Sequence, residues 1–175
     1  MRLRNLLAII ALLIILAALP LLLATCQGAH AQDDNPTGPQ ATLPRAPLTI
    51  IDDNGKPHHF QVEMATTAQE QVTGLMFRTS VPADGGMLFV FPTVQPEAFW
   101  MKNTLVPLDM VFINPDGTIR AIAEDTVPYS LAPVSSQGPV KAVLELQGGL
   151  TARDSISVGD QVIAAPFGNV KAGGQ

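Results

Sequence analysis

The stretch FWMKNTLVPLDMVFI, residues 99–113, places polar side chains within the most apolar part of the sequence. Lys102 and Asn103 follow Trp100, and Asp109 lies inside the next apolar run. In an extended chain Trp100 and Lys102 share a face, so the lysine stem can lie along the indole while its ammonium reaches a carboxylate. Asp109, or Glu145 in the segment VLEL, is the candidate carboxylate.

Two interpretations of this polar cluster remain open. In the first, a partly buried Lys102–Asp109 ion pair holds one end of the fold together. In the second, the cluster is the rim of a binding site for a small polar ligand, a glycan or an envelope partner, in which Trp100 stacks on the ligand. The candidate rim residues are Arg78, Trp100, Lys102, Asn103, Asp109, Tyr129, Ser135 and Glu145.

An enzyme is the alternative function class. A hydrolase or lyase could use Asp109 or Glu145 as a base, with Lys102 or Arg78 stabilising developing negative charge. A serine nucleophile at Ser135 is disfavoured because its flanks lack a Gly-x-Ser-x-Gly elbow. The sequence therefore assigns no catalytic residue and favours a non-catalytic binding module. A third interpretation makes the motif architectural, with function on another surface.

Metal and cofactor sites are not predicted. His58 and His59 flank a turn, and without cysteine ligands a zinc site would need distant carboxylates, so we expect solvent-exposed histidines. The segment DDNG at residues 52–55 lacks the alternating ligands of a calcium loop and predicts a turn.

The first 31 residues have the features of a secretory signal peptide. MRLRN is basic, residues 6–23 are almost entirely Leu, Ile and Ala, and AHA ending at Ala31 fits a cleavage site. We therefore predict a periplasmic or secreted protein. Two alternatives would instead attach it to a membrane through residues 1–31: an uncleaved apolar anchor, or lipidation of Cys26 in LATC, where threonine is an unusual residue before the cysteine.

Charge and cysteine content narrow the partners. The chain carries a formal charge of −5, which becomes two units more negative when Arg2 and Arg4 leave with the signal peptide. An acidic domain without a basic patch is a poor partner for nucleic acid. Cys26 is the single cysteine, so a cleaved protein would contain neither disulfides nor thiol chemistry.

The domain organisation follows from composition. Residues 32–47 are rich in Pro, Asp and Gly and predict a flexible linker, whereas residues 168–175 predict a loose tail. Between them, residues 48–167 predict a single folded domain. Residues 124–139 contain three prolines and predict a long loop that would present Tyr129 and Ser135.

About eight short strands and one helix are expected in this domain. Asn54-Gly55 predicts a hairpin, and Thr67 with Glu70 predicts a capping box that opens a helix over residues 68–77, weakened by Gly74. The strands are expected at residues 48–51, 59–64, 87–91, 98–102, 108–113, 118–123, 140–146 and 161–165. This pattern favours a mainly β, compact β-barrel-like single domain, with a β-sandwich as the alternative.

Several motifs resemble a known family. GLMFR (residues 74–78), GMLFVF (86–91), FWMKNT followed by PLD, VLEL (143–146) and VGD (158–160) occur in this order. Together they resemble the prokaryotic family called domain of unknown function 192, over roughly residues 48–165. The resemblance implies a compact β-barrel-like fold and an exported protein, and it brings no established activity. Its motif positions here are Arg78, Trp100, Lys102, Asn103, Asp109 and Glu145.

Overall fold

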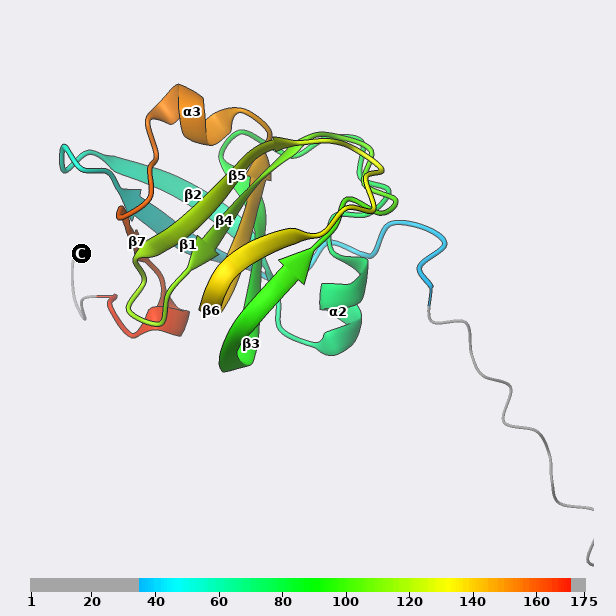
Figure 1. Cartoon of the computed structure of the whole chain (residues 1–175), viewed down its shortest axis with the longest axis horizontal. Coiled ribbons are helices and arrows are strands. Elements are labelled where there is room, and N and C mark those ends of the chain that lie inside the picture. Colours follow the sequence, from blue (N-terminus) through cyan, green and yellow to red (C-terminus); the bar gives the residue numbers. More distant parts are fainter. Residues whose placement is uncertain (1–34, 171–175) are drawn as a thin grey trace, which may run out of the picture. The chain divides into compact units, whose positions relative to one another are not determined.

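One seven-stranded sheet organises the computed structural model, which describes residues 35–170 (Figure 1). Its strand order is β5-β4-β6-β3-β2-β1-β7, and every neighbouring pair is antiparallel except β2 and β3. The elements are β1 (Arg45–Ile51), β2 (Pro57–Ala65), α2 (Ala68–Thr73), β3 (Gly85–Phe99), β4 (Leu108–Ile113), β5 (Ile119–Thr126), β6 (Val134–Gln147), α3 (Leu150–Asp154), β7 (Gln161–Ile163) and the 3-10 helix η2 (Ala165–Phe167).

The two edges of the sheet meet at one end. An isolated antiparallel bridge joins Thr118, just before β5, to Gln161 in β7. The amide of Ile119 donates to the Asp160 carbonyl at 2.9 Å, and the amide of Val162 donates to the Gly117 carbonyl at 2.8 Å. Closure of this kind removes exposed edges. The mainly β, barrel-like domain predicted from the sequence is confirmed, and a single sheet replaces the alternative of a two-sheet sandwich.

Two apolar clusters occupy the two faces of the sheet. The barrel interior draws side chains from all seven strands and α3, among them Leu48, Phe60, Leu88, Val111, Leu144, Leu150 and Val162. The outer face of β3, β6 and β4 carries a second cluster that includes Met87, Phe89, Met110, Phe112 and Val143. Because side chains alternate along a strand, Val111 and Leu144 face inward while Met110 and Val143 face outward. A strand buried on both faces needs a continuous apolar run, which explains MLFVF and LDMVFI.

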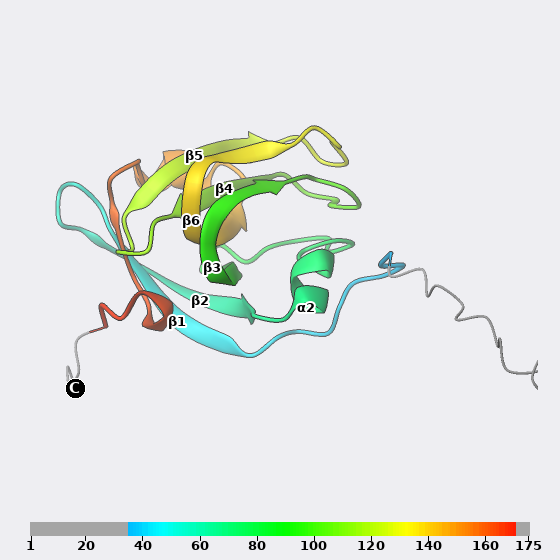
Figure 2. The same ribbon diagram turned by 60° about the horizontal axis from the view of Figure 1, so that its bottom comes forward.

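Strands β3 and β6 curl together over the outer face (Figure 2). Their pairing runs from Met87 opposite Glu145 to Phe99 opposite Val134, with register shifts near the middle. Pro96 lies opposite Pro139 beside these shifts, and since proline donates no hydrogen bond it is tolerated where a ladder is interrupted. We call the distal halves, residues 95–99 and 134–139, the curled arm.

The curled arm corrects two predictions. The strands expected at residues 87–91 and 98–102 are parts of one strand, β3, which ends at Phe99. The long loop expected at residues 124–139 is also wrong, because β5 continues to Thr126 and β6 begins at Val134. Prolines predict loops, but here they accompany the bend of a paired ribbon.

The helices differ in number from the prediction. Helix α2 has the predicted capping box: Thr67 Oγ1 accepts from the Glu70 amide, and the Glu70 carboxylate accepts from the Thr67 amide. It ends at Thr73 rather than residue 77, because Gly74 caps it with φ of 48°. Helix α3 was not predicted. The hairpin at Gly55 is confirmed by the antiparallel pairing of β1 with β2.

The amino-terminal predictions fall mostly outside the described residues. The signal peptide of residues 1–31 lies beyond them entirely. Strand β1 begins at Arg45, inside the predicted linker, and Gln40 already hydrogen-bonds α2. Within residues 35–170, no helix is long and apolar enough to cross a membrane.

Candidate functional site

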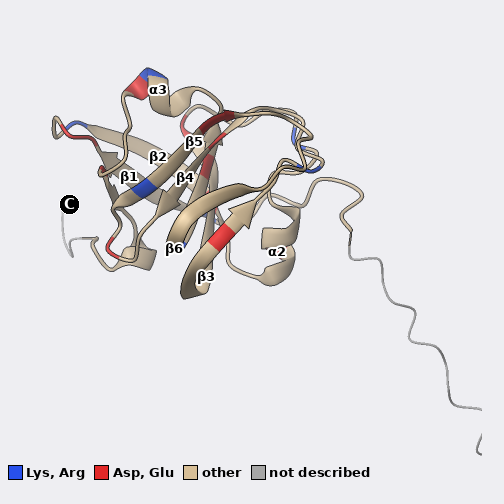
Figure 3. Cartoon of the chain, in the orientation of Figure 1, with Lys and Arg blue, Asp and Glu red and all other residues tan. Residues whose placement is uncertain are grey.

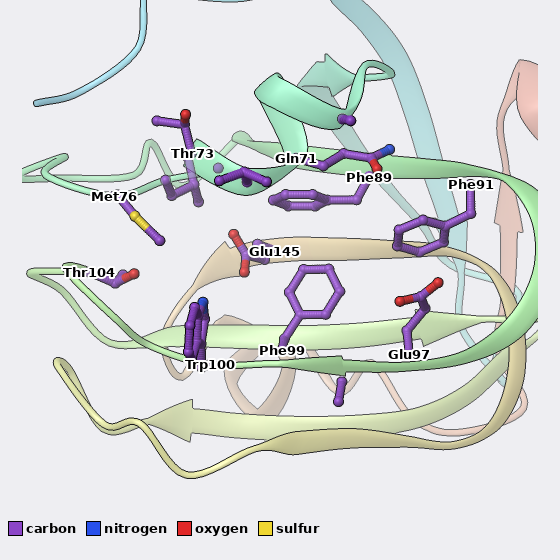
Figure 4. Close-up of a pocket in the computed structure, with 15 residues that line it drawn as sticks. Gln71, Thr73, Met76, Phe89, Phe91, Glu97, Phe99, Trp100, Thr104 and Glu145 are labelled. Atoms are coloured by element: carbon purple, nitrogen blue, oxygen red, sulfur yellow. The ribbon is translucent and has the colours of Figure 1, made fainter. Parts of the chain in front are cut away.

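A cavity of about 430 Å³ lies between α2 and the curled arm (Figure 4). Its wall is mainly apolar and aromatic, and its two ionisable residues are both acidic. The lining residues are Ala68, Gln71, Val72, Thr73, Gly74, Leu75, Met76, Phe89, Phe91, Glu97, Ala98, Phe99, Trp100, Thr104 and Glu145. A concave apolar site of this size with few polar groups is typical of small-molecule binding.

Glu145 is the buried acid of this cavity. It lies on β6 between Met87 of β3 and Met110 of β4, on the outer face. Its residue surface is only 5% exposed, and its carboxylate points into the space between Met76 and Trp100 (Figure 4). Among the described residues, no side chain or backbone group hydrogen-bonds or ion-pairs with this carboxylate. Burial alone raises the pKa of Glu145 from 4.5 to about 8, because removal from water disfavours the charged form.

Helix α2 is fixed over the cavity by amide side chains. Gln71 Nε2 donates to the carbonyls of Ala65 at 3.1 Å and Val90 at 2.9 Å, which ties the helix to β2 and β3. Gln40 Nε2 donates to the carbonyls of Glu70 and Gly74 at the other end. The helix wall of the cavity is therefore tied to the sheet through Gln71 and to the segment before β1 through Gln40.

Aromatic rings line the cavity from two parts of β3. Phe99, on the curled arm, meets Phe89 edge-on with ring centroids 5.1 Å apart, and Phe91 at 6.4 Å. Such edge-to-face pairs stabilise the packing by about 1 kcal/mol each. A Cβ at Gly74 would lie 3.1 Å from the Phe89 ring, so the absence of a side chain there allows the end of α2 to approach the ring.

Asp109 is not paired with Lys102, and the predicted Lys102–Asp109 ion pair is wrong. Asp109 is fully buried on the barrel-interior face of β4. One oxygen accepts from the amides of Asp125 and Gly149, both at 2.8 Å. The other accepts from the amide and the hydroxyl of Thr151, both at 2.7 Å. The carboxylate thus joins β4, β5 and the first turn of α3, and it does not line the cavity.

Arg78 is also engaged away from the cavity. Its two terminal nitrogens donate to the two oxygens of Glu63 at 3.2 and 3.0 Å. Glu63 is 5% exposed and accepts in addition from the Leu43 amide. This bidentate geometry is the strong form of an Arg–carboxylate contact. Among the described residues, the Arg78 Nε is the one side-chain polar atom that is closed off from solvent and lacks a hydrogen-bond partner.

Trp100 and Lys102 lie at the mouth of the cavity. Trp100 lines it and is half-exposed, and the Lys102 Nζ lies 5.2 Å from the centroid of the indole. Asn103 has φ of 55°, its carbonyl accepts from the Phe77 amide, and its Nδ2 lies 3.8 Å from Met76 Sδ. The sequence predicted that the lysine stem would follow the indole while the ammonium reached a carboxylate; in the structure the ammonium itself lies over the ring.

Tyr129 and Ser135 do not line the cavity. Tyr129 is 61% exposed, and its amide donates to the Thr104 carbonyl, which holds the loop of residues 127–133 beside the loop after β3. Ser135 is exposed on the curled arm, where its hydroxyl accepts from the Gln137 amide. Of the eight predicted rim residues, the structure places Trp100 and Glu145 in the cavity wall.

The sequence did not indicate Glu97, Phe89, Phe91 or Phe99 as site residues. The odd-numbered aromatics of β3 share the outer face with Met87 and the facing Glu145, which period-two alternation could have shown. What it could not show is that the curled arm returns over that face.

Of the two histidines predicted to be solvent-exposed, His59 is exposed and His58 is not. His58 is buried and its Nε2 lies 3.2 Å from the Asp52 carboxylate, which also accepts from the Asn54 and Lys56 amides in the predicted turn. Within residues 35–170, no group of three or more His, Cys, Asp or Glu could hold a metal ion.

The chain belongs to a family of proteins with no established function. The family model DUF192, described as "Uncharacterized ACR", matches residues 49–164, which confirms the resemblance noted in the motifs. A comparison with curated proteins finds no match.

Two solved structures are similar to this chain. A protein from Sinorhizobium meliloti 1021, described as a "putative transcription regulator", shares 41% identity with a TM-score of 0.70, over 73% of this chain and 98% of its own. A protein of unknown function from Novosphingobium aromaticivorans DSM 12444 shares 38% identity with a TM-score of 0.68, over 78% of this chain and all of its own.

Proposed function

We propose that this domain is a non-catalytic binding protein for a small molecule, held in the cavity between α2 and the curled arm. The observation that carries the proposal is Glu145: a carboxyl almost completely buried, without a partner among the described residues, and directed into an open cavity. A buried ionisable group without a partner destabilises a fold. Its retention in a cavity is therefore best explained by a ligand that contacts it.

Ligand screening with the single tryptophan as reporter tests this proposal. Trp100 lines the cavity, so a bound molecule changes its fluorescence. A library of neutral, anionic and cationic small molecules should yield compounds that change Trp100 emission and raise the melting temperature.

A blocking variant identifies the place of binding. Glu97 lines the cavity from the curled arm, where its side chain points inward and is only partly buried (Figure 4), so Glu97→Phe should narrow the cavity with little loss of stability and remove the response. Asp53→Asn, in the exposed turn, should leave the response intact. The proposal is wrong if no compound in the library binds, or if Glu97→Phe binds every hit as well as the wild type does; the motif would then be architectural.

An enzyme is a second candidate, favoured by the pKa of about 8 for Glu145. A carboxyl that titrates near neutral pH can act as a general acid or base. The cationic stabilisers expected from the sequence do not join it, because Arg78 is paired with Glu63 and does not line the cavity. Any turnover found with a hit from the screen should be lost in Glu145→Gln, whereas binding without turnover supports the binding protein.

The description of the Sinorhizobium relative as a regulator is not extended to this chain. Nucleic-acid binding requires a basic surface, whereas this chain is acidic. Figure 3 shows acidic and basic segments spread over separate strands and loops.

We place this binding protein in the periplasm or outside the cell, on the basis of the signal peptide predicted for residues 1–31. Intact-mass measurement of the exported protein should show an amino terminus at Gln32. An intact first segment, or a lipid on Cys26, would instead attach the domain to a membrane.

A further inference from the structure

The ionisable residues in the wall of the cavity, Glu145 and Glu97, are both acidic. Glu70 of α2 is turned to the helix start, where its carboxylate accepts from Thr66 and Thr67. Beside the mouth, the Lys102 ammonium lies over Trp100. A ligand that enters the cavity thus meets two acids and no basic side chain of the wall.

The uncharged polar side chains of the wall are already committed to backbone carbonyls. Thr73 Oγ1 donates to Gln69, and Thr104 Oγ1 donates to Lys102. Gln71 Nε2 donates to Ala65 and Val90. A glycan needs many hydrogen-bonding partners, and this wall has few to offer. Of the two acids in the wall, Glu145 is the buried one and remains available for a ligand.

The remaining wall is aromatic. Phe89, Phe99 and Trp100 lie around Glu145, and Phe91 lines the cavity further along, near Glu97 (Figure 4). The faces of aromatic rings attract cations, and rings grouped around a cavity are a general means of recognising alkylated ammonium groups. The Lys102 ammonium already makes such a contact with Trp100.

We propose that the cavity binds the cationic head of an organic ammonium compound, with the aromatic rings around the alkyl groups and Glu145 as the counter-ion. This inference rests on the proposed function, since it names the chemical class of the ligand for the same site. The volume of about 430 Å³ is enough for a substituted ammonium group with a short apolar body.

Ligand binding is then coupled to release of a proton. Without a ligand, burial keeps Glu145 protonated at neutral pH, because its pKa is about 8. An incoming cation within a few ångströms favours the carboxylate. Glu145 loses its proton to solvent as the cation binds, so one positive charge leaves as another enters and the occupied site stays neutral. Affinity for a cation of fixed charge therefore rises with pH until Glu145 is ionised before binding.

A pair of isosteric probes tests this inference on the wild-type protein. Choline carries a quaternary ammonium group that does not titrate, and 3,3-dimethylbutan-1-ol has nearly the same shape without the charge. Dissociation constants would be measured by Trp100 fluorescence and by calorimetry at pH 6.5 and pH 8.5. We expect choline to bind roughly tenfold or more tightly at pH 8.5, since one pH unit below the pKa changes the ionised fraction about tenfold. At pH 8.5 the alcohol should bind more weakly than choline, and its affinity should not rise with pH.

Two variants assign the effect to Glu145. Glu145→Gln keeps the neutral shape of the protonated acid, so it should abolish both the preference for choline and its pH dependence. Glu97→Gln is the matched control, because Glu97 lies at the same cavity on the exposed arm. It should keep the rise in choline affinity between the two pH values.

The outcomes separate this inference from the proposed function. Equal affinity for the two probes, or an unchanged preference for choline in Glu145→Gln, overturns the cation site but leaves a small-molecule site. If neither probe binds while the library screen finds other ligands blocked by Glu97→Phe, the cation site is wrong but the small-molecule site stands. If that screen also finds none, both are wrong.

Discussion

Asp109 and Glu145 are buried carboxyls on adjacent strands with opposite environments. Asp109 pairs with Leu146 and Glu145 with Met110 in the β4–β6 ladder, and their side chains lie on opposite faces of the sheet. Asp109 accepts four hydrogen bonds. Glu145 faces a cavity and accepts none from the described residues.

The difference separates a structural acid from one suited to a ligand. A buried charge is stable only when it is paired or hydrogen-bonded. Asp109 meets that requirement with donors from β5, α3 and the residue before α3, so it fixes three segments to one another. Glu145 meets it by staying protonated, which leaves a buried group whose charge state a ligand can change. Two carboxyls that look alike in sequence thus have separate physical roles.

The largest change in stability is expected for Asp109→Asn. The amide offers one acceptor oxygen and sets its NH2 group against backbone donors, so buried hydrogen bonds are lost and donors are left unpaired. We expect the free energy of unfolding, measured by urea denaturation, to fall by about 3–5 kcal/mol. Asp53→Asn, in the exposed turn after β1, is the control and should stay within about 0.5 kcal/mol. A loss below 1 kcal/mol at Asp109 would contradict its structural role.

Glu145→Gln should instead raise the free energy of unfolding. The pKa is raised from 4.5 to about 8 in the folded protein, so the folded state holds a proton that the unfolded chain releases as pH rises through this range. The stability of the wild type therefore falls between these two pH values, and it is unaffected by Glu145 below the lower one. Glutamine cannot ionise, so the variant should be more stable by about 3 kcal/mol at pH 7.

Denaturation at two pH values checks this prediction. At pH 4 both the folded and the unfolded wild type are largely protonated at Glu145, so the difference from Glu145→Gln should nearly vanish. A variant that is less stable than the wild type at pH 7 would mean that the carboxylate is stabilised in the fold. Glu145 would then be a stabilising acid like Asp109, and the difference between the two carboxyls would not hold.

The smallest loss of stability is expected for Lys102→Met. The cation–π contact of Lys102 with the half-exposed Trp100 is worth about 0.5–1 kcal/mol at an exposed site. Loss of this contact should lower the free energy of unfolding, measured in urea, by about that amount. A loss as large as that of Asp109→Asn would contradict this ranking. Combining the two substitutions should give additive losses, because residues without shared contacts do not couple.

Much of the fold followed from local patterns. Alternation and continuous apolar runs predicted the strands, the Thr67–Glu70 capping box predicted the start of α2, and Gly55 predicted the hairpin. These features depend on residues close in sequence, whose backbone preferences act within a few positions. The prediction of a long loop at residues 124–139 was wrong, because prolines at a bend in a paired ribbon cannot be told from prolines in a loop by sequence alone.

The candidate site was only partly predictable. Glu145 and Trp100 were recognised as candidates from the sequence and its motifs, and both line the cavity. Asp109 was assigned the wrong partner, since its donors lie 16, 40 and 42 residues away. No local pattern shows which distant amides a carboxylate will meet.

The sequence by itself determined the β elements, their two apolar faces and the presence of acids within them. Side-chain alternation and burial of apolar surface are sufficient for that. Only the tertiary structure decided which acid is enclosed by hydrogen bonds and which one opens onto a cavity. The physical reason is that α2 and the curled arm must fold back over the same sheet face before a cavity exists, and that approach joins segments far apart in the chain.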